Sequence, residues 1–107
     1  MSLSESTQRI IDLMNDSQNE VPYHIRLQPH VFAVEDLRSV LHYKAEKYLK
    51  SLPDDMSFLG TPERNITRDK QAKWTNIVAQ PGMLSGMGAG MLKILVVDAW
   101  LDFDGVN

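Results

Sequence analysis

The stretch VEDLRSVLHYKAEKYLKSL, residues 34–52, carries the strongest structural signal in the chain. Its apolar residues return at steps of three and four, which places them along one side of an α-helix. Glu35 and Asp36 lie in the first turn and Lys50 lies near the end, so these charges complement the helix dipole. Pro53 cannot continue a helix. The sequence therefore predicts a helix over residues 34–52.

A further helix is expected on each side of this segment. Residues 4–15 have a partial apolar face, formed by Ile10, Ile11, Leu13 and Met14. Thr61-Pro62-Glu63 is typical of a helix start, because a capping threonine is followed by a proline and an acidic residue. The helix predicted from there covers about residues 62–79. Four of its residues are expected to face inward: Ile66, Trp74, Ile77 and Val78.

Residues 22–29 are expected to be extended. The segment has a proline at each end, and residues before a proline disfavour the helical conformation. Between the prolines, Tyr23, Ile25 and Leu27 alternate with polar residues, which is the pattern of a half-buried strand. Because a single strand is not stable by itself, this prediction requires a partner strand.

The segment 82–104 allows two interpretations. As a helix it is apolar on nearly every side, and its length and its leucine, methionine and alanine content favour this conformation. The alternative is a glycine-rich loop or helix up to about residue 91, followed by a strand that pairs with residues 23–28. We expect the helix. The predicted fold is thus α+β and predominantly α-helical, with three or four helices and at most a small sheet, in one domain of residues 1–107.

Composition excludes several classes of protein. The chain has 107 residues, of which 43% are hydrophobic, and it has no cysteine. A formal net charge of −3 provides no large positive field for nucleic acid. The first residues contain neither a basic start nor an apolar run, so we expect a cytoplasmic protein. Lys93 and Asp98 interrupt the apolar run 82–101 and argue against insertion into a membrane.

The most unusual stretch lies between Pro81 and Met91. Small and sulfur-containing residues recur there at every fourth position: Gly82, Gly86 and Gly90, and Met83, Met87 and Met91. In one continuous helix, the glycines would form a smooth groove beside a ridge of adaptable methionines. The structural interpretation is a close contact within the chain or a mobile loop. The functional one is a non-enzymatic protein–protein interaction or assembly surface, used by a homo-oligomer or for a protein partner.

An alternative hypothesis is a small ligand-binding or acid–base enzyme domain. Its candidate residues are His24, Arg26, His42, Asp98 and Asp102. The two aspartates are four residues apart, so a helix would place them on one face, where paired carboxylates perform proton transfer or hold a cation. No histidine pair has metal-ligand spacing and no glycine motif fits a phosphate-binding loop, so neither a metal nor a cofactor is predicted.

A third option is nucleic-acid binding through residues 64–74. Four basic residues and one tryptophan lie there: Arg64, Arg68, Lys70, Lys73 and Trp74. Glu63 and Asp69 offset their charge, whereas a nucleic-acid-binding domain usually carries a denser basic stripe. We therefore expect a solvated helix face rather than a nucleic-acid interface.

Overall fold

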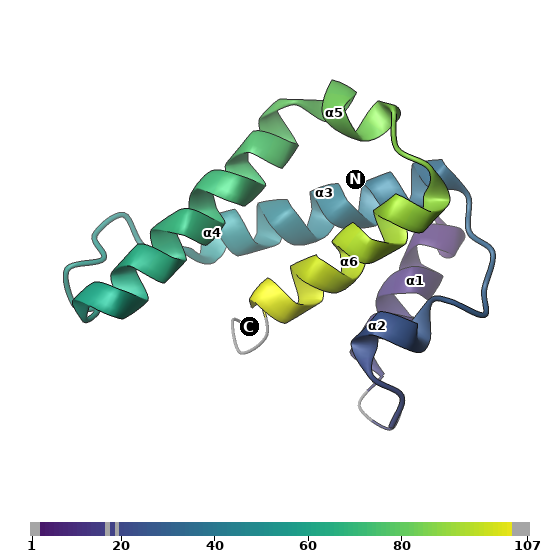
Figure 1. The fold of residues 1–107 in the computed structure, drawn as a ribbon, viewed down its shortest axis with the longest axis horizontal. Helices are drawn as coiled ribbons and strands as arrows, with labels where there is room; N and C mark the ends of the chain where they lie inside the picture. Colours follow the sequence, from purple (N-terminus) through teal and green to yellow (C-terminus); the bar gives the residue numbers. More distant parts are fainter. Residues whose placement is uncertain (1–2, 17, 19, 104–107) are drawn as a thin grey trace.

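The computed structural model describes residues 3–16, 18 and 20–103, and in this part of the chain it contains helices and no strand. The helices are α1 (Glu5–Asn15), α2 (Tyr23–Arg26), α3 (Val34–Ser51), α4 (Thr61–Ala79), α5 (Pro81–Ser85) and α6 (Ala89–Phe103) (Figure 1). The described fold is therefore all-helical with six helices. The predicted α+β class, with three or four helices, is wrong.

The helix predicted from residues 34–52 is confirmed as α3 and lies at the centre of the fold. It packs against α1, α4 and α6. Its buried residues follow the predicted period: Leu37, Val40, Leu41, Ala45 and Tyr48. The helix ends at Ser51 because Leu52 precedes Pro53 and takes the extended conformation that this position favours.

Residues 22–29 do not form the predicted strand. Pro22 instead precedes a single helical turn, α2, in which the amide of Ile25 donates to the carbonyl oxygen of Pro22 at 3.1 Å. Proline suits this position, since the first residues of a helix need no amide donor. The turn buries Leu27 and leaves Ile25 exposed, so alternating polarity did not lead to alternating burial. With the C-terminal segment helical, no partner strand is present among the described residues.

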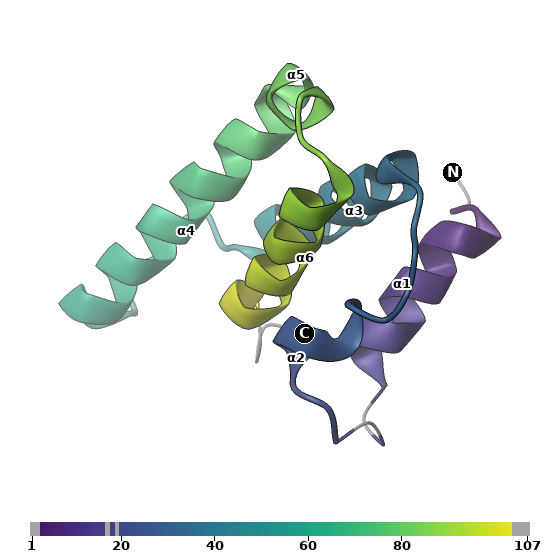
Figure 2. The same ribbon diagram turned by 45° about the vertical axis from the view of Figure 1, so that its right-hand side comes forward.

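The C-terminal segment is helical as expected, but it is divided. The chain leaves α5 at Ser85, turns through Gly86 and Gly88, and begins α6 at Ala89 (Figure 2). The alternative of a strand after residue 91 is wrong, and the predicted end at residue 104 lies outside the described residues. One side of α6 is buried through Leu92, Val96, Val97, Ala99, Trp100 and Phe103.

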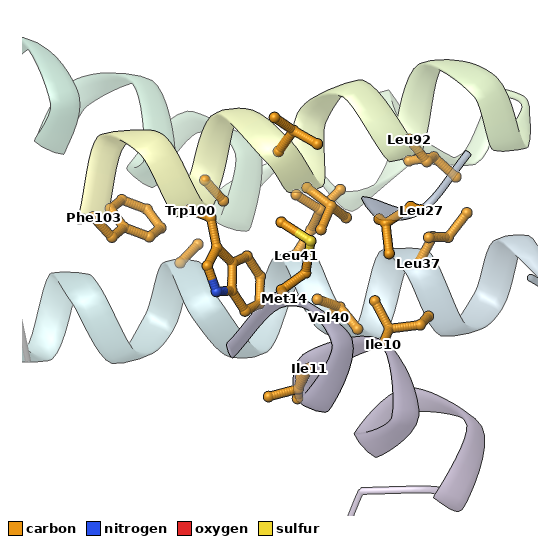
Figure 3. Close-up of a cluster of buried hydrophobic side chains, with 14 of the residues drawn as sticks. Ile10, Ile11, Met14, Leu27, Leu37, Val40, Leu41, Leu92, Trp100 and Phe103 are labelled. Carbon is orange, nitrogen blue, oxygen red and sulfur yellow. The ribbon is translucent and has the colours of Figure 1, made fainter. Parts of the chain in front are cut away.

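The hydrophobic core forms where α1 and α6 cover α3 (Figure 3). Ile10 and Met14 enter it from α1, Leu41 from α3, and Leu92 and Trp100 from α6. The indole nitrogen of Trp100 donates to Oδ1 of Asn15 at 2.8 Å, which joins the end of α1 to α6. Helices from both ends of the described chain thus share one core.

The predicted inner face of α4 is only partly confirmed. Trp74 and Ile77 are buried and Val78 is half-buried, but Ile66 is 55% exposed. The reason lies in the geometry, because the N-terminal part of α4 extends past the other helices (Figures 1 and 2). A periodic pattern predicts which side of a helix is buried. How far this burial extends along the helix depends on the neighbouring elements.

Candidate functional site

A hollow of about 510 Å³ lies between α2 and α6. Its apolar walls come from Leu27 of the segment after α2 and from Ile94, Val97 and Leu101 of α6. Its polar lining consists of His24, Gln28, Lys93 and Asp98, and Gly90 completes it. A mostly apolar hollow of this size with a few polar groups is typical of binding sites.

Large apolar side chains lie exposed on the same side of α6. Met91 is 53% exposed, Ile94 is 57% exposed and Leu101 is 56% exposed. They are separated by three and seven residues, which places them along one face of the helix. The opposite face is buried against α3, so α6 is apolar on both sides and only one side is covered.

Two opposite charges also line the hollow. The ammonium of Lys93 donates to the carbonyl oxygen of His30 at 2.6 Å and lies 5.9 Å from the ring centre of Phe32. Asp98 is partly exposed, and among the described residues it forms no ion pair. A cation or hydrogen-bond donor on a molecule bound in the hollow would find a charged acceptor in this carboxylate.

The structure brings together only part of the predicted acid–base set. His24 and Asp98 line the same hollow from α2 and α6. Arg26 borders an adjoining hollow of about 340 Å³, which shares His24 and Leu101 with the first. His42 and Asp102 line neither of these hollows. Asp102 instead accepts hydrogen bonds from Lys73 and Trp74 of α4, so its carboxylate is engaged away from the hollow that Asp98 lines.

Arg26 has a structural role that the sequence did not reveal. Its Nη1 atom donates to the carbonyl oxygen of Met14 at 2.7 Å, and its Nε atom donates to that of Val21 at 2.8 Å. Nη1 also lies 3.4 Å from the carbonyl oxygen of Leu13. The last carbonyl groups of a helix lack partners within it, so this guanidinium caps the C-terminus of α1.

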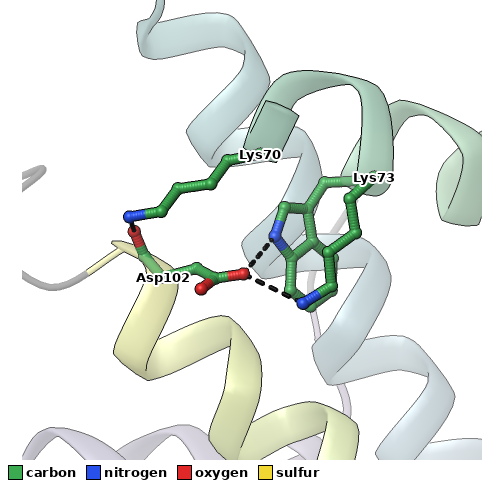
Figure 4. Close-up of polar contacts among 4 residues, drawn as sticks. Lys70, Lys73 and Asp102 are labelled. Carbon is green, nitrogen blue, oxygen red and sulfur yellow. Dashed lines mark hydrogen bonds and ion pairs between the residues drawn. The ribbon is translucent and has the colours of Figure 1, made fainter. Parts of the chain in front are cut away.

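Asp102 fastens the C-terminal end of α6 to α4 (Figure 4). Its Oδ2 atom accepts hydrogen bonds from Nε1 of Trp74 at 2.9 Å and from Nζ of Lys73 at 3.1 Å. Its backbone carbonyl oxygen accepts a further bond from Nζ of Lys70 at 3.1 Å. Two of the basic side chains considered for nucleic-acid binding are therefore directed at Asp102.

An aromatic cluster lies beside this junction. Phe103 stacks on Tyr48 with ring centres 4.2 Å apart and contacts Trp74 at 5.0 Å. Burial raises the pKa of the Tyr48 phenol above its ordinary value, and the negative charge of Asp102 adds to this effect. Both influences disfavour the phenolate, so Tyr48 is kept neutral at the junction.

The glycine–methionine segment does not form the single groove and ridge that were expected. Gly82 belongs to α5 and Gly90 to α6, with Gly86 in the turn between these helices. A Cβ atom added at any of these three positions would meet nothing within 4 Å. The structural interpretation, a close contact within the chain, is therefore wrong for these three glycines. Met83 and Met91 are exposed, and Met87 is half-buried.

Sequence reasoning missed the residues that complete the hollow. They are Leu27, Gln28, Lys93, Ile94, Val97 and Leu101. One signal was available, since a helix that is apolar on every side must leave part of its apolar surface uncovered unless neighbours surround it. The sequence could not indicate which side α3 would cover.

No group of three or more histidine, aspartate or glutamate side chains among the described residues is placed to hold a metal ion. No helix among them has both the length and the apolar character of a membrane span. No protein-family model, curated protein or solved structure matches the chain.

Proposed function

We propose that this chain is a non-enzymatic protein-binding module that acts in the cytoplasm, and that its binding surface is the exposed face of α6 with the adjoining hollow. The observation that carries the proposal is the row of Met91, Ile94 and Leu101, each more than half exposed along one side of α6. Exposed apolar side chains that gather in one place commonly mark a protein-interaction surface.

The shape of this surface supports the proposal. Helical partners bind in grooves through apolar residues spaced by three, four and seven positions, and α6 presents this spacing beside a hollow. Fully burying one side chain of this size contributes about 1.5–3 kcal/mol. The three side chains are already partly covered, so a partner would gain a fraction of this from each.

The proposed surface differs from the segment expected from the sequence. Of the six residues predicted to form an interface, Gly90 lines the hollow and Met91 belongs to the exposed row. The remaining four lie in α5 and in the turn that follows it: Gly82, Met83, Gly86 and Met87. Our proposal therefore moves the centre of the interface toward Ile94 and Leu101.

Site-specific photo-crosslinking tests the proposal. A benzophenone side chain would replace Ile94 in the chain expressed in its native cells, and a control would carry it at Asn65, which is exposed on α4. We expect a discrete protein adduct from position 94 and none from position 65. Mass spectrometry then identifies the adduct. If position 94 captures no more protein than position 65, this surface does not bind proteins.

A second candidate function is the binding of a small ligand, which one observation favours. His24 and Asp98 converge on the 510 Å³ hollow, and pockets for small molecules typically measure roughly 300–1,000 Å³. Native mass spectrometry of the chain isolated from its own cells would detect a retained ligand. Asp98→Asn should lower its occupancy, while Asp69→Asn on α4 should not. A bare chain mass in every preparation would contradict this candidate.

A further inference from the structure

Among the long helices of the described chain, α4 is attached to the core by the fewest side chains. It buries Trp74 and Ile77 out of 19 residues, whereas α6 buries six of 15 and α3 buries five of 18. The short helix α5 packs on α4 and adds the buried Leu84. Since apolar burial is the main force that holds helices together, α4 and α5 are joined to the rest of the chain by a small part of the core.

The sequence of α4 also provides little stability of its own. Residues 65–67 are Asn-Ile-Thr and residues 75–78 are Thr-Asn-Ile-Val, and these residue types are weak helix formers. In water, a helix of such composition depends on packing against its neighbours. If α4 lost its contacts, its backbone hydrogen bonds would therefore open as well.

The polar attachment of α4 to α6 is concentrated at one residue (Figure 4). Trp74 and Lys73 donate to the Asp102 carboxylate, and Lys70 donates to its backbone carbonyl oxygen. Among the described residues, every side-chain hydrogen bond between the two helices ends at Asp102. The loss of this one residue's contacts would release the whole polar junction.

Neither end of the α4–α5 segment is held by close packing at its glycines. Gly60 is the N-cap of α4 and provides no side-chain hydrogen bond to the helix. At the other end, a Cβ atom added at Gly86 or Gly88 would meet nothing within 4 Å. The backbone at both ends therefore has room to turn.

We infer that α4 and α5 open as one unit while α1, α3 and α6 remain packed, and that the bonds to Asp102 form the latch that keeps the unit closed. Opening removes Trp74 from Phe103, whose ring centre lies 5.0 Å away, and uncovers the stacked rings of Phe103 and Tyr48. This apolar surface is separate from the proposed binding surface, because no residue of α4 lines the hollow. The inference therefore goes beyond the proposed function and does not depend on it.

Native-state hydrogen exchange of the full chain tests the opening. In the natural chain, amides of residues 70–78 should open roughly tenfold or more often than those of residues 40–48 in α3. Ile10→Val weakens the part of the core that stays packed in both states, since Ile10 is buried on α1 and α1 packs on α3. It should raise the opening of the α3 amides roughly two- to tenfold and leave the α4 amides unchanged. If it raises both by the same factor, α4 opens only when the whole chain unfolds, and the inference is overturned.

The same measurement tests the latch. Asp102→Ala should raise the opening of the α4 amides roughly tenfold, and Asp102→Asn should raise it less because the amide oxygen still accepts from Trp74. Asp98→Ala on the same helix serves as the control and should leave α4 unchanged. Equal effects of Asp102→Ala and Asp98→Ala on α4 would show that Asp102 is not the latch.

Thiol labelling shows whether side chains are uncovered as well as amides. The chain has no cysteine, so a single introduced thiol reports only its own position. Ile77→Cys places a thiol on the buried side of α4, and Val96→Cys places one on the buried side of α6. Relative to the same chains in urea, the Ile77→Cys thiol should react roughly tenfold or more faster than the Val96→Cys thiol. Equal relative rates would overturn the separate opening of α4.

Discussion

The indole nitrogen of Trp74 donates to Oδ2 of Asp102 at 2.9 Å, and this bond joins α4 to the last turn of α6. Trp74 is 0% exposed in the intact chain, so its N–H group relies on Asp102 for an acceptor. A buried donor without an acceptor destabilises a fold by about 1–3 kcal/mol. The ion pair between Lys73 and the same carboxylate is partly exposed and contributes only about 0–1 kcal/mol.

Asp102→Ala should therefore lower the free energy of unfolding by about 1–3 kcal/mol. Asp102→Asn should lower it less, because the amide oxygen still accepts from Trp74. Asp98→Ala provides the matched control, since Asp98 lies one turn earlier on α6 and makes no ion pair among the described residues. Urea denaturation measures all three. Equal losses for Asp102→Ala and Asp98→Ala would contradict the assignment.

Removal of the Arg26 side chain should weaken the end of α1. Arg26→Ala leaves the carbonyl oxygen of Met14 without its charged donor, and we expect a loss of about 1–3 kcal/mol. Arg26→Lys should recover only part of this, because lysine keeps the charge but lacks the planar fork of donors. His24→Ala in the same turn is exposed and should change stability by less than about 0.5 kcal/mol.

Hydrogen exchange locates the effect of Arg26→Ala. The amides of the last turn of α1 should exchange faster in this variant than in His24→Ala. Unchanged protection there would show that the guanidinium does not hold the helix end.

Glycine replacements in the α5 region should stabilise the single chain. The backbone at Gly86 has φ −88° and ψ 0°, which other residues adopt, and an added Cβ there meets nothing within 4 Å. Gly86→Ala should raise the free energy of unfolding by about 0.4–1 kcal/mol, because alanine reduces the freedom of the unfolded chain. Thermal denaturation under dilute, monomeric conditions measures the gain.

Gly60→Ala serves as the contrasting case for this prediction. Gly60 is the N-cap of α4, and an added Cβ would lie 2.6 Å from Oε2 of Glu63. Alanine is a poorer N-cap than glycine, and the Glu63 carboxylate must move, so no gain is expected. If Gly86→Ala lowers the free energy of unfolding instead of raising it, the turn after α5 requires glycine.

Tyr48 should make stability fall at alkaline pH. Because its pKa is raised in the folded chain, the folded state keeps the phenolic proton at a pH where the unfolded state releases it. This stabilisation is complete below the unfolded pKa, near pH 10, and is lost as the pH rises toward the folded value. Tyr48→Phe removes this contribution.

Denaturation measured between roughly pH 8 and pH 11 tests the prediction for Tyr48. Burial, with a smaller effect of Lys47, lowers the pKa of Lys44, and this gives a slope of opposite sign. Lys44 is present in both the natural chain and Tyr48→Phe, so its contribution largely cancels when their free energies of unfolding are subtracted. The natural chain should lose stability relative to Tyr48→Phe above pH 10, and parallel profiles would contradict this.

Local signals in the sequence were sufficient for the long helices. The period of three and four, together with Pro53, predicted α3 to within one residue, and Thr61-Pro62-Glu63 predicted the start of α4. Residues 22–29 were mispredicted because six alternating residues do not distinguish a strand from a single helical turn. The conformation there depends on the burial of Leu27 in a core that is formed by helices distant in the sequence. A local pattern contains no information about these contacts.

The candidate site was predictable only in part for a related reason. His24 and Asp98 were both selected from the sequence, and the fold brings them to one hollow. Arg26 was selected too, but its partner Met14 lies twelve residues away and reaches it only when α1 and α2 pack together. The apolar pattern of residues 89–103 indicated a surplus of apolar surface, and the position of α3 decided that Ile94 and Leu101 stay exposed.

The bond between Trp100 and Asn15 joins residues that are 85 positions apart, and it has a consequence for how the chain is made. A ribosome completes α1, α2 and α3 long before it reaches α6. Until Trp100 and Phe103 have been synthesised, the side of α3 that α6 covers has nothing to pack against, and the closing of the core waits for these residues. A chaperone that binds nascent chains would find this side of α3 exposed for the longest time.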